Sequence, residues 1–357
     1  MWYAAAEPMP PGLARIGGAA TALVVGLVVA IAIGEAIVRL ADVTPAGVNA
    51  GYLQFGYATG IPAFDEDVRS EGQPGRVRLF EPDPETLWRP IPNTEYTNSR
   101  GFRGRSEYTE RKTPDTFRVL FIGDSCTFVG DPNYPELVEQ ELDSRAGRRV
   151  ECINAAVPGY SSLQGVKLLP RLHPWSPDAV VVYFGWNDQW PGQGGLTDEL
   201  QFATHHGLRV LGLARAASAR WRASPTSRVP LADFRRNLEI IRDAVVAWGA
   251  VPIFITAPTG FRAGAMAPWA NRFFGEFYRM DAPAVAAIPA VHALYADSVR
   301  AVAATPPAVL VDAERDFAAA DTGSPTLFRR DQIHLSTAGH ERMAGLVAAT
   351  LAWALHR

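Results

Sequence analysis

Phe117-Arg118-Val119-Leu120-Phe121-Ile122-Gly123-Asp124-Ser125 is the stretch that decides the fold of this chain. A largely apolar, β-branched run of only about seven residues is typical of a buried strand in a parallel sheet. Glycine allows a tight turn at the end of that strand. Asp124 and Ser125 then stand where a following helix begins and its N–H groups are unpaired. The stretch therefore predicts either a nucleophilic serine beside an anion site or, more simply, a helix cap.

Segments typical of strands and of helices alternate after this stretch. Five strands alternating with helices predict an α/β fold, with a parallel sheet covered on both faces. Two interruptions, 189–228 and 259–282, break the alternation. Aromatic residues of the second, Phe261 and Phe274 among them, are expected to line an acyl pocket, to form a lid or to form a satellite core. The expected strands are 117–122, 149–154, 179–184, 251–256 and 308–312, and the expected helices are 126–145, 162–172, 231–249, 284–303 and 336–355.

The composition is that of a folded protein without a polyanionic partner. Hydrophobic residues make up 48% of the 357 residues, and 34 basic and 37 acidic residues give a net charge of −3. This balance argues against nucleic-acid binding. Cys126 and Cys152 are too few for a disulfide framework or a zinc site, and we expect both to be small buried residues. The pair His205-His206 has no third ligand in view, so we expect no metal or organic cofactor.

The N-terminal region predicts a membrane anchor. Residues 1–15 form a short proline-rich tail, and residues 16–38 are apolar for 23 positions. At 1.5 Å per residue such a helix spans a hydrocarbon core of roughly 30 Å, so we expect an anchor over 16–40 that contacts lipid through 16–38. A cleaved signal peptide and a buried core helix are the alternatives. Arg15 and Arg39 flank the two ends, which leaves the orientation open.

Small residues recur at every fourth position of this segment. Gly18, Ala22, Gly26, Ala30 and Gly34 therefore share one face of a helix. Such a stripe allows a second membrane helix to approach closely. The stripe also fits a chance alignment, because glycine and alanine are frequent in the segment. The sequence therefore allows two interpretations, a transmembrane partner at this face or a chance alignment of small residues.

An irregular arm over 41–115 is expected to join the anchor to the main domain, 116–357. The arm is rich in Pro, Gly, Asn and Arg, and it has no helical period. Short strands and packing on the main domain through Phe80, Trp88 and Phe102 are expected. A flexible linker is the alternative, chiefly for its first half.

Candidate catalytic residues fall at the carboxyl ends of the expected strands, where open parallel sheets bind ligands. Ser125 follows the first strand, Gly159 the second and Asn187 the third, and Asp331 and His334 precede the last helix. Three residues apart in a tight loop, an aspartate can accept the Nδ1 hydrogen of the histidine and leave Nε2 to face a serine. The histidine then takes the serine proton and returns it to the leaving group.

Attack on an ester carbonyl produces an oxyanion, which requires preorganised donors. We expect these to be the backbone N–H groups of Ser125 and Gly159 and the side-chain amide of Asn187. Asp188 is expected to hold the loop after the third strand in place.

Four short blocks resemble those of the SGNH (GDSL) hydrolase family. Gly123-Asp124-Ser125, Gly159, Gly185-x-Asn187-Asp188 and Asp331-x-x-His334 occur in this order, and the resemblance covers about residues 116–355. It implies a flavodoxin-like three-layer α/β/α fold. It also implies a serine nucleophile, a histidine base oriented by the aspartate, and glycine and asparagine as oxyanion donors, each at its position in these blocks.

The anchor and the arm motif Asn98-Ser99-Arg100-Gly101-Phe102-Arg103-Gly104 are similar to a bacterial, envelope-anchored branch of that family. This implies a single-pass protein of the bacterial inner membrane with a periplasmic catalytic domain. By analogy, the substrate is an O-acyl ester, first of all an O-acetyl group on an envelope polysaccharide. An O-acyltransferase with the same triad and a non-catalytic accessory subunit of a membrane complex are the alternatives.

Overall fold

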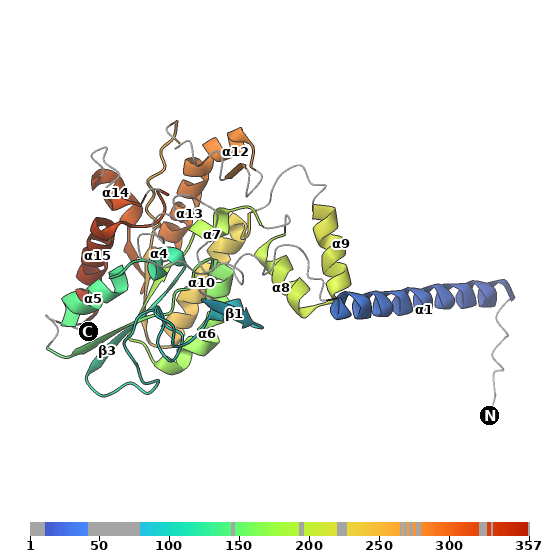
Figure 1. Ribbon diagram of the computed structural model, residues 1–357, viewed down its shortest axis with the longest axis horizontal. Coiled ribbons are helices and arrows are strands. Elements are labelled where there is room, and N and C mark those ends of the chain that lie inside the picture. Colours follow the sequence, from blue (N-terminus) through green and yellow to red (C-terminus); the bar gives the residue numbers. More distant parts are fainter. Residues whose placement is uncertain are drawn as a thin grey trace, which may run out of the picture.

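A five-stranded parallel sheet lies at the centre of the body of the molecule in the computed structural model (Figure 1). The strand order β4-β3-β5-β6-β7 places the first strand between the second and the third, as in flavodoxin-like folds. The predicted fold class is confirmed. The strands are β3 (Thr116–Gly123), β4 (Arg149–Asn154), β5 (Ala179–Tyr183), β6 (Val251–Ile255) and β7 (Val309–Val311). The structure describes residues 11–41, 79–143, 147–192, 196–219, 227–264, 266, 270, 274–275, 280–320, 327–329 and 331–355.

Strand β3 is an internal strand of the sheet, because all eight of its residues are buried and it pairs with both β4 and β5. Val119 and Phe121 face one hydrophobic cluster, and Leu120 and Ile122 face the other. Side chains alternate in this way along any strand, so a strand that is apolar at every position needs helices on both faces. The first cluster is covered by α5 (Tyr134–Asp143), α14 (Ala313–Ala320) and α15 (Thr337–Leu355), and the second by α6 (Ser162–Leu172), α10 (Leu231–Ala247) and α13 (Ile288–Ala303).

Two predicted helices are interrupted in the structure, and further helices lie outside the predicted ranges. The helix expected over 126–145 is divided into α4 (Ser125–Phe128) and α5. Pro132 lies between them, and proline disfavours helical backbone at the residue before it. The short helix α12 (Ala282–Ala286) precedes α13, which begins anew at a proline in its first turn. Helix α14 lies in the segment expected to be a loop after the fifth strand.

The arm packs on the body from residue 79 onward. Strands β1 (Phe80–Asp83) and β2 (Leu87–Pro90) form an antiparallel hairpin. Trp88 meets Tyr160 edge to face at 5.5 Å between ring centroids, and Phe102 meets Trp175 at 4.8 Å. Edge-to-face pairs of this kind stabilise by about 0.5–1.5 kcal/mol beyond the area they bury. The flexible-linker alternative therefore does not describe this part, and residues 42–78 lie outside the described residues.

The two interruptions have different structures. The first contains α8 (Asp198–His206) and α9 (Arg209–Ala219). In the second, Phe261 and Phe274 are buried against Trp186 and Trp190 within the first hydrophobic cluster. They therefore extend the main core and do not form the separate satellite core that was one of the expectations. The other aromatic residues of the second interruption, and the side chains of the His205-His206 pair, lie outside the described part of the chain.

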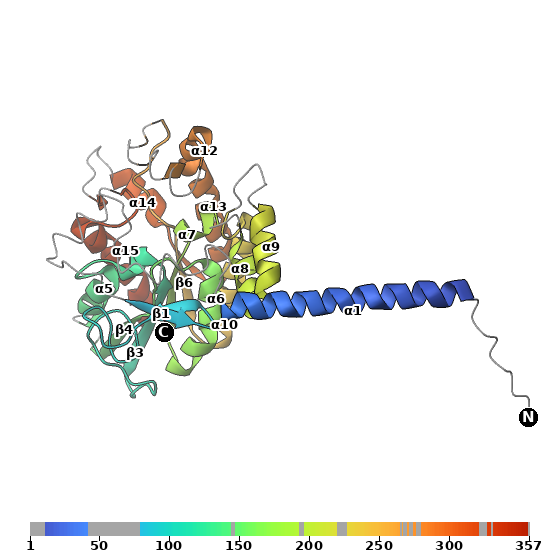
Figure 2. The same cartoon turned by 45° about the vertical axis from the view of Figure 1, so that its right-hand side comes forward.

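Helix α1 (Pro11–Leu40) projects from the body (Figures 1 and 2). Within the described ranges it is the one helix that is long and apolar enough to cross a membrane, over Ala19–Leu40. Only 6% of that span is buried, whereas the core helix of a soluble protein is mostly buried. Its exposed side chains are apolar, with Leu23, Leu27, Ile33 and Ile37 all more than half exposed.

A buried carboxylate holds the loop after β5. Helix α7 (Trp186–Gln189) carries Asp188, whose Oδ1 accepts hydrogen bonds from the Ser162 backbone N–H at 2.8 Å and hydroxyl at 2.5 Å. Asn237 of α10 donates to the same hydroxyl at 3.0 Å. Burial raises the pKa of Asp188 to about 7, against the hydrogen bonds from Ser162. Asp188 therefore fastens the loop to the start of α6, as predicted from the sequence.

Replacement of Asp188 by asparagine is expected to change how stability depends on pH. Because the pKa is raised in the folded state from 3.8 to about 7, the contribution of this group is fully present below its unfolded pKa and is lost as pH rises through about 7. Asparagine keeps the acceptor for Ser162 and cannot ionise. Urea denaturation of the two proteins should therefore show that the wild type loses stability relative to Asp188→Asn between about pH 4 and pH 7. A constant difference across that range would contradict this assignment.

Candidate active site

The turn between β3 and α4 places Ser125 at the edge of the sheet. Gly123 ends the strand, and a Cβ atom there would lie 2.7 Å from Thr127 Oγ1 and from the carbonyl oxygen of Tyr183. No other residue fits without displacement of its neighbours. Asp124 is the N-cap of α4, because its Oδ1 accepts a hydrogen bond from the Cys126 N–H at 2.8 Å. The capping function thus belongs to Asp124, and the half-buried Ser125 is left available for chemistry.

Ser125, His334 and Asp331 form one continuous chain of hydrogen-bonding groups. His334 Nε2 lies 2.8 Å from Ser125 Oγ, and His334 Nδ1 lies 2.7 Å from Asp331 Oδ2. Asp331 has only oxygen acceptors at that position, so the hydrogen of the neutral imidazole is on Nδ1 and Nε2 accepts from the serine hydroxyl. This geometry allows His334 to remove the serine proton.

The loop that carries His334 is held in a tight turn. Asp331 Oδ1 accepts from the backbone N–H groups of Ile333 and His334, both at 2.8 Å. Gln332 adopts a φ of 61°, an uncommon conformation for a residue with a side chain. Burial acts to raise the pKa of Asp331, but the charge of His334 and these hydrogen bonds outweigh it and lower that pKa below its usual range. Asp331 is therefore a carboxylate at neutral pH.

The three predicted oxyanion donors lie at the ends of three neighbouring strands. The N–H of Ser125 opens α4, where the first amides of a helix have no intrahelical acceptor. Gly159 has a φ of 81° in the turn after β4. Asn187 is 8% exposed, and its Nδ2 donates to Asp124 Oδ2 at 3.2 Å. That bond fixes the amide of Asn187 while leaving its second hydrogen for another acceptor.

Asp124 links the two sides of this site through its two oxygens. One oxygen caps α4 and the other holds Asn187. Burial raises the pKa of Asp124 to about 6, although the hydrogen bonds from Cys126 and Asn187 and the charge of His334 act to lower it. The carboxylate is thus ionised at neutral pH and becomes protonated in mild acid.

Arg228 and Asp198 also act on this site, and sequence reasoning missed them. Arg228 Nη1 donates to the carbonyl oxygen of Gly159 at 2.9 Å, while Nε and Nη2 bind the two oxygens of Asp198, both at 2.9 Å. Both side chains are buried. From the arm, Trp88 Nε1 donates to the carbonyl oxygen of Pro158 at 3.2 Å. An arginine and an aspartate thirty positions apart in an insertion give no sequence signal for this function.

The cysteines lie inside the core. Cys126 and Cys152 are unpaired and buried, as predicted. Burial raises the pKa of the Cys126 thiol well above its usual value, and the charges of Asp124 and Asp331 act in the same direction. The thiol beside Ser125 is therefore neutral and is not a nucleophile.

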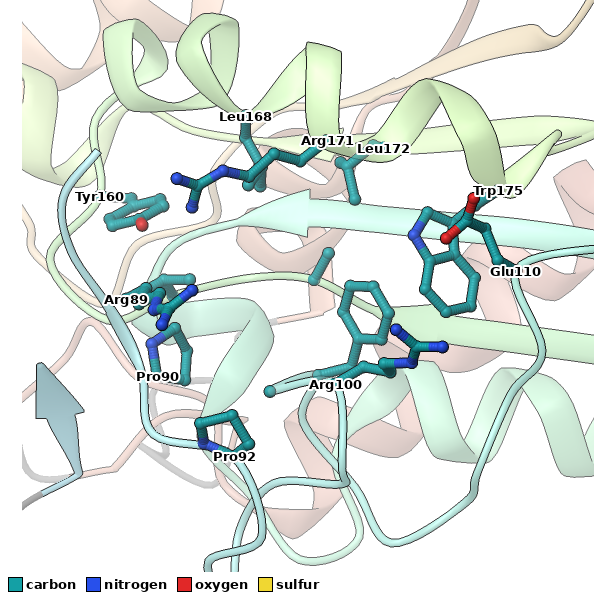
Figure 3. Close-up of a pocket in the computed structure, with 14 residues that line it drawn as sticks. Arg89, Pro90, Pro92, Arg100, Glu110, Tyr160, Leu168, Arg171, Leu172 and Trp175 are labelled. Carbon is teal, nitrogen blue, oxygen red and sulfur yellow. The ribbon is translucent and has the colours of Figure 1, made fainter. Parts of the chain in front are cut away.

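A cavity of about 340 Å³ adjoins the loop that carries Gly159, because Val157 and Tyr160 of that loop line it (Figure 3). Tyr160, the residue after Gly159, forms part of its wall. Arginines from three different segments line the cavity, namely Arg89 of β2, Arg100 of the arm and Arg171 of α6. The remaining wall is largely apolar or aromatic, and it includes Pro90, Pro92, Phe102, Val157, Leu168, Leu172 and Trp175.

The chain resembles known ester hydrolases in sequence and fold. It matches the model of the GDSL-like Lipase/Acylhydrolase family over residues 121–342. A lipase/acylhydrolase from Enterococcus faecalis is 20% identical, with 66% of this chain and 95% of that one covered and a TM-score of 0.44. The acetylxylan esterase Axe2 from Geobacillus stearothermophilus is 16% identical, with coverage of 67% and 94% and a TM-score of 0.42. No curated protein matches the chain.

The family match covers more than half of the 357 residues, from β3 to α15. It includes all four sequence blocks and the turn that carries Ser125. The chain therefore belongs to the GDSL-like lipase/acylhydrolase family of ester hydrolases.

Proposed function

We propose that the chain is a membrane-anchored serine esterase that hydrolyses O-acyl esters, with Ser125 as nucleophile, His334 as base and Asp331 as its orienting group. The observation that carries this proposal is the unbroken chain of hydrogen-bonding groups from Asp331 through His334 to Ser125, with distances of 2.7 and 2.8 Å. A carboxylate at one end and a hydroxyl at the other are what acyl transfer to serine requires.

The reaction follows from this arrangement in two halves. Ser125 Oγ attacks the ester carbonyl carbon while its proton moves to His334 Nε2, and Asp331 stabilises the resulting imidazolium. The negative charge that develops on the carbonyl oxygen is bound by the N–H groups of Ser125 and Gly159 and by the Asn187 amide. His334 gives its proton to the leaving alcohol. Water, deprotonated by His334, then releases the acid from the acyl-enzyme.

Replacement of Ser125 by alanine is expected to abolish both ester hydrolysis and labelling by a fluorophosphonate probe, because the attacking oxygen is removed. The matched control is Ser298→Ala, which makes the same change at a half-buried serine of α13, outside the proposed site. Circular dichroism checks that each variant is folded. Labelling of the folded wild type that persists in Ser125→Ala would place the nucleophile elsewhere. A folded wild type that is neither labelled nor active would instead favour the accessory-subunit alternative.

Replacement of Asn187 by alanine is expected to lower kcat by about 10²–10³-fold with little change in KM, because its amide would bind charge that exists only in the transition state. Steady-state kinetics on a soluble acyl ester measures this. A proportional rise in KM with unchanged kcat would show that Asn187 contributes only to ground-state binding.

We further propose that the alcohol part of the substrate is a carbohydrate, bound in the cavity beside the Gly159 loop. Arg171 is held by Asp83 and Glu85, and Arg89 by Glu81, so their guanidinium groups are fixed and mostly neutralised. A guanidinium has five N–H donors, and those not used in ion pairs are suited to sugar hydroxyls. Apolar and aromatic walls with a few fixed donors are typical of small-molecule sites, and 340 Å³ is at the lower end of their usual volume.

Arg100 offers the cleanest test of this carbohydrate site. Its guanidinium makes no hydrogen bond or ion pair with the residues that the structure describes, and Figure 3 shows it beside the cavity. Arg100→Ala should raise KM about 5–10-fold for an acetylated oligosaccharide, roughly 1–1.4 kcal/mol of binding, and leave hydrolysis of 4-nitrophenyl acetate unchanged. Arg105→Ala, at an exposed position of the same arm, is the matched control. Equal effects on both substrates would contradict a glycan site.

The proposed location is the bacterial inner membrane, with α1 in the bilayer and the body in the periplasm. The support is the apolar surface of α1, most of which no described part of the body covers. Exposure of such a surface to water is unfavourable, whereas lipid can surround it. A cleaved signal peptide can have the same composition as α1. The contacts between α1 and the body, described below, distinguish a retained anchor from a signal peptide.

A further inference from the structure

Helix α1 is bonded to the body at its carboxyl end. Glu35 Oε2 accepts a hydrogen bond from the Val210 N–H at 3.0 Å, and Glu35 Oε1 accepts one from Arg39 at 2.7 Å. Arg39 also donates to the carbonyl oxygen of Gly207 at 3.4 Å. Glu35 is only 7% exposed, although nearly all its neighbours on α1 are exposed. The one acidic residue of the apolar segment thus has partners in the first long insertion.

The carboxylate of Glu35 completes the N-terminus of α9. The first amides of a helix have no intrahelical partner, and a negative charge is favourable there. Helix α9 has no acidic residue in its own first turn, so Glu35 supplies that charge from another element. Gly34 lies at this contact, since a Cβ atom at its position would be 3.5 Å from Val210 Cγ2, an ordinary van der Waals distance. The last glycine of the small-residue stripe therefore faces α9 of the same chain.

These contacts fix α9 crosswise to α1. Figures 1 and 2 both show α9 running across the end of α1 where that helix meets the body. A helix that crosses the end of a membrane span lies along the membrane surface. The contact with Gly34 lies inside the apolar span, which extends to Leu40, so the start of α9 reaches the depth of the lipid interface.

The exposed residues at the start of α9 are of the types found in helices that lie in a membrane interface. Leu208 is 41% exposed and Leu211 is 42% exposed. Arg215 is also exposed. Its spacing of four from Leu211 puts these two residues on one side of α9, and Leu208 directly precedes that helix. Leucines that enter the headgroup boundary and arginines that meet lipid phosphates are typical of helices lying in the interface.

We propose that α9 and the residue before it dock, through Leu211 and Leu208, on the lipid surface around the end of α1, so that anchor and insertion form one membrane-binding surface. This rests on the membrane anchoring proposed above. Lipid is the occupant because the exposed leucines flank Val210, which meets the apolar span at Gly34 and Glu35, and because the exposed Arg215 matches the negative charge of phospholipids. The docking also makes α1 a permanent part of the folded protein, in contrast to a signal peptide.

The same insertion connects the membrane surface with the active site. Helix α8 begins at Asp198, which binds Arg228, and Arg228 holds the carbonyl oxygen of Gly159. Helices α8 and α9 therefore lead from the Arg228–Asp198 pair at the proposed oxyanion loop to the end of the anchor. Docking of α9 sets the distance of the active site from the bilayer.

The experiment uses the full chain reconstituted in phospholipid vesicles. Leu211→Cys carries an environment-sensitive fluorophore, and Leu294→Cys, at an exposed leucine of α13, is the matched control. The native cysteines are both buried, so labelling is confined to the introduced thiol. A quencher attached to the lipid headgroup region should quench the label at 211 several-fold more than the label at 294. Equal quenching of the labels at positions 211 and 294 would overturn the proposal.

A disulfide test separates this proposal from membrane anchoring itself. In the membrane fraction, Gly34→Cys with Val210→Cys should cross-link under mild oxidation. Gly26→Cys with Val210→Cys should not, because a Cβ atom at Gly26 meets nothing within 4 Å. Carbonate-resistant protein without the first cross-link would retain the anchor and overturn the docking. Release of the protein by carbonate, or a mature N-terminus beyond residue 40, would overturn the anchor and the docking together.

Discussion

The turn at Gly123 is the constraint on which the rest of the structure depends. Strand β3 is buried on both faces and must leave the sheet at the point where Thr127 and the Tyr183 carbonyl leave no room for a side chain. The chain therefore turns directly from a rigid strand into α4. A hydroxyl placed by such a turn has little freedom to move, so preorganisation of the proposed nucleophile follows from packing of the core rather than from contacts at the site itself.

Buried polar groups extend this rigidity to the neighbouring loops. Asp188 fastens the loop that carries Asn187 to the start of α6, and Arg228 with Asp198 fixes the turn that contains Gly159. Each group satisfies backbone donors or acceptors that would otherwise be costly in a dry interior. The three loops that hold the proposed oxyanion donors are thus held by different elements, which include one insertion that is remote in sequence.

The sequence is most informative where one physical requirement acts alone. Strands β3 and β5 were predictable because burial on both faces demands a continuous apolar run. The order of the four blocks indicated the family. The break between α4 and α5 falls at Pro132, whereas the apolar pattern alone predicted one continuous helix. The Arg228–Asp198 pair and the cavity beside Tyr160 were not predictable, because they depend on which surface of the body the arm and the insertion cover.

The bond between Glu35 and α9 has a consequence for the order of assembly. The two partners are 175 positions apart, so in the proposed anchored protein α1 would enter the lipid long before the amide of Val210 exists. Until then the carboxylate of Glu35 would be without this partner at the edge of a medium that disfavours charge. Under that proposal, formation of α9 after insertion would settle α1 at its final depth, and folding of the body would complete what insertion began.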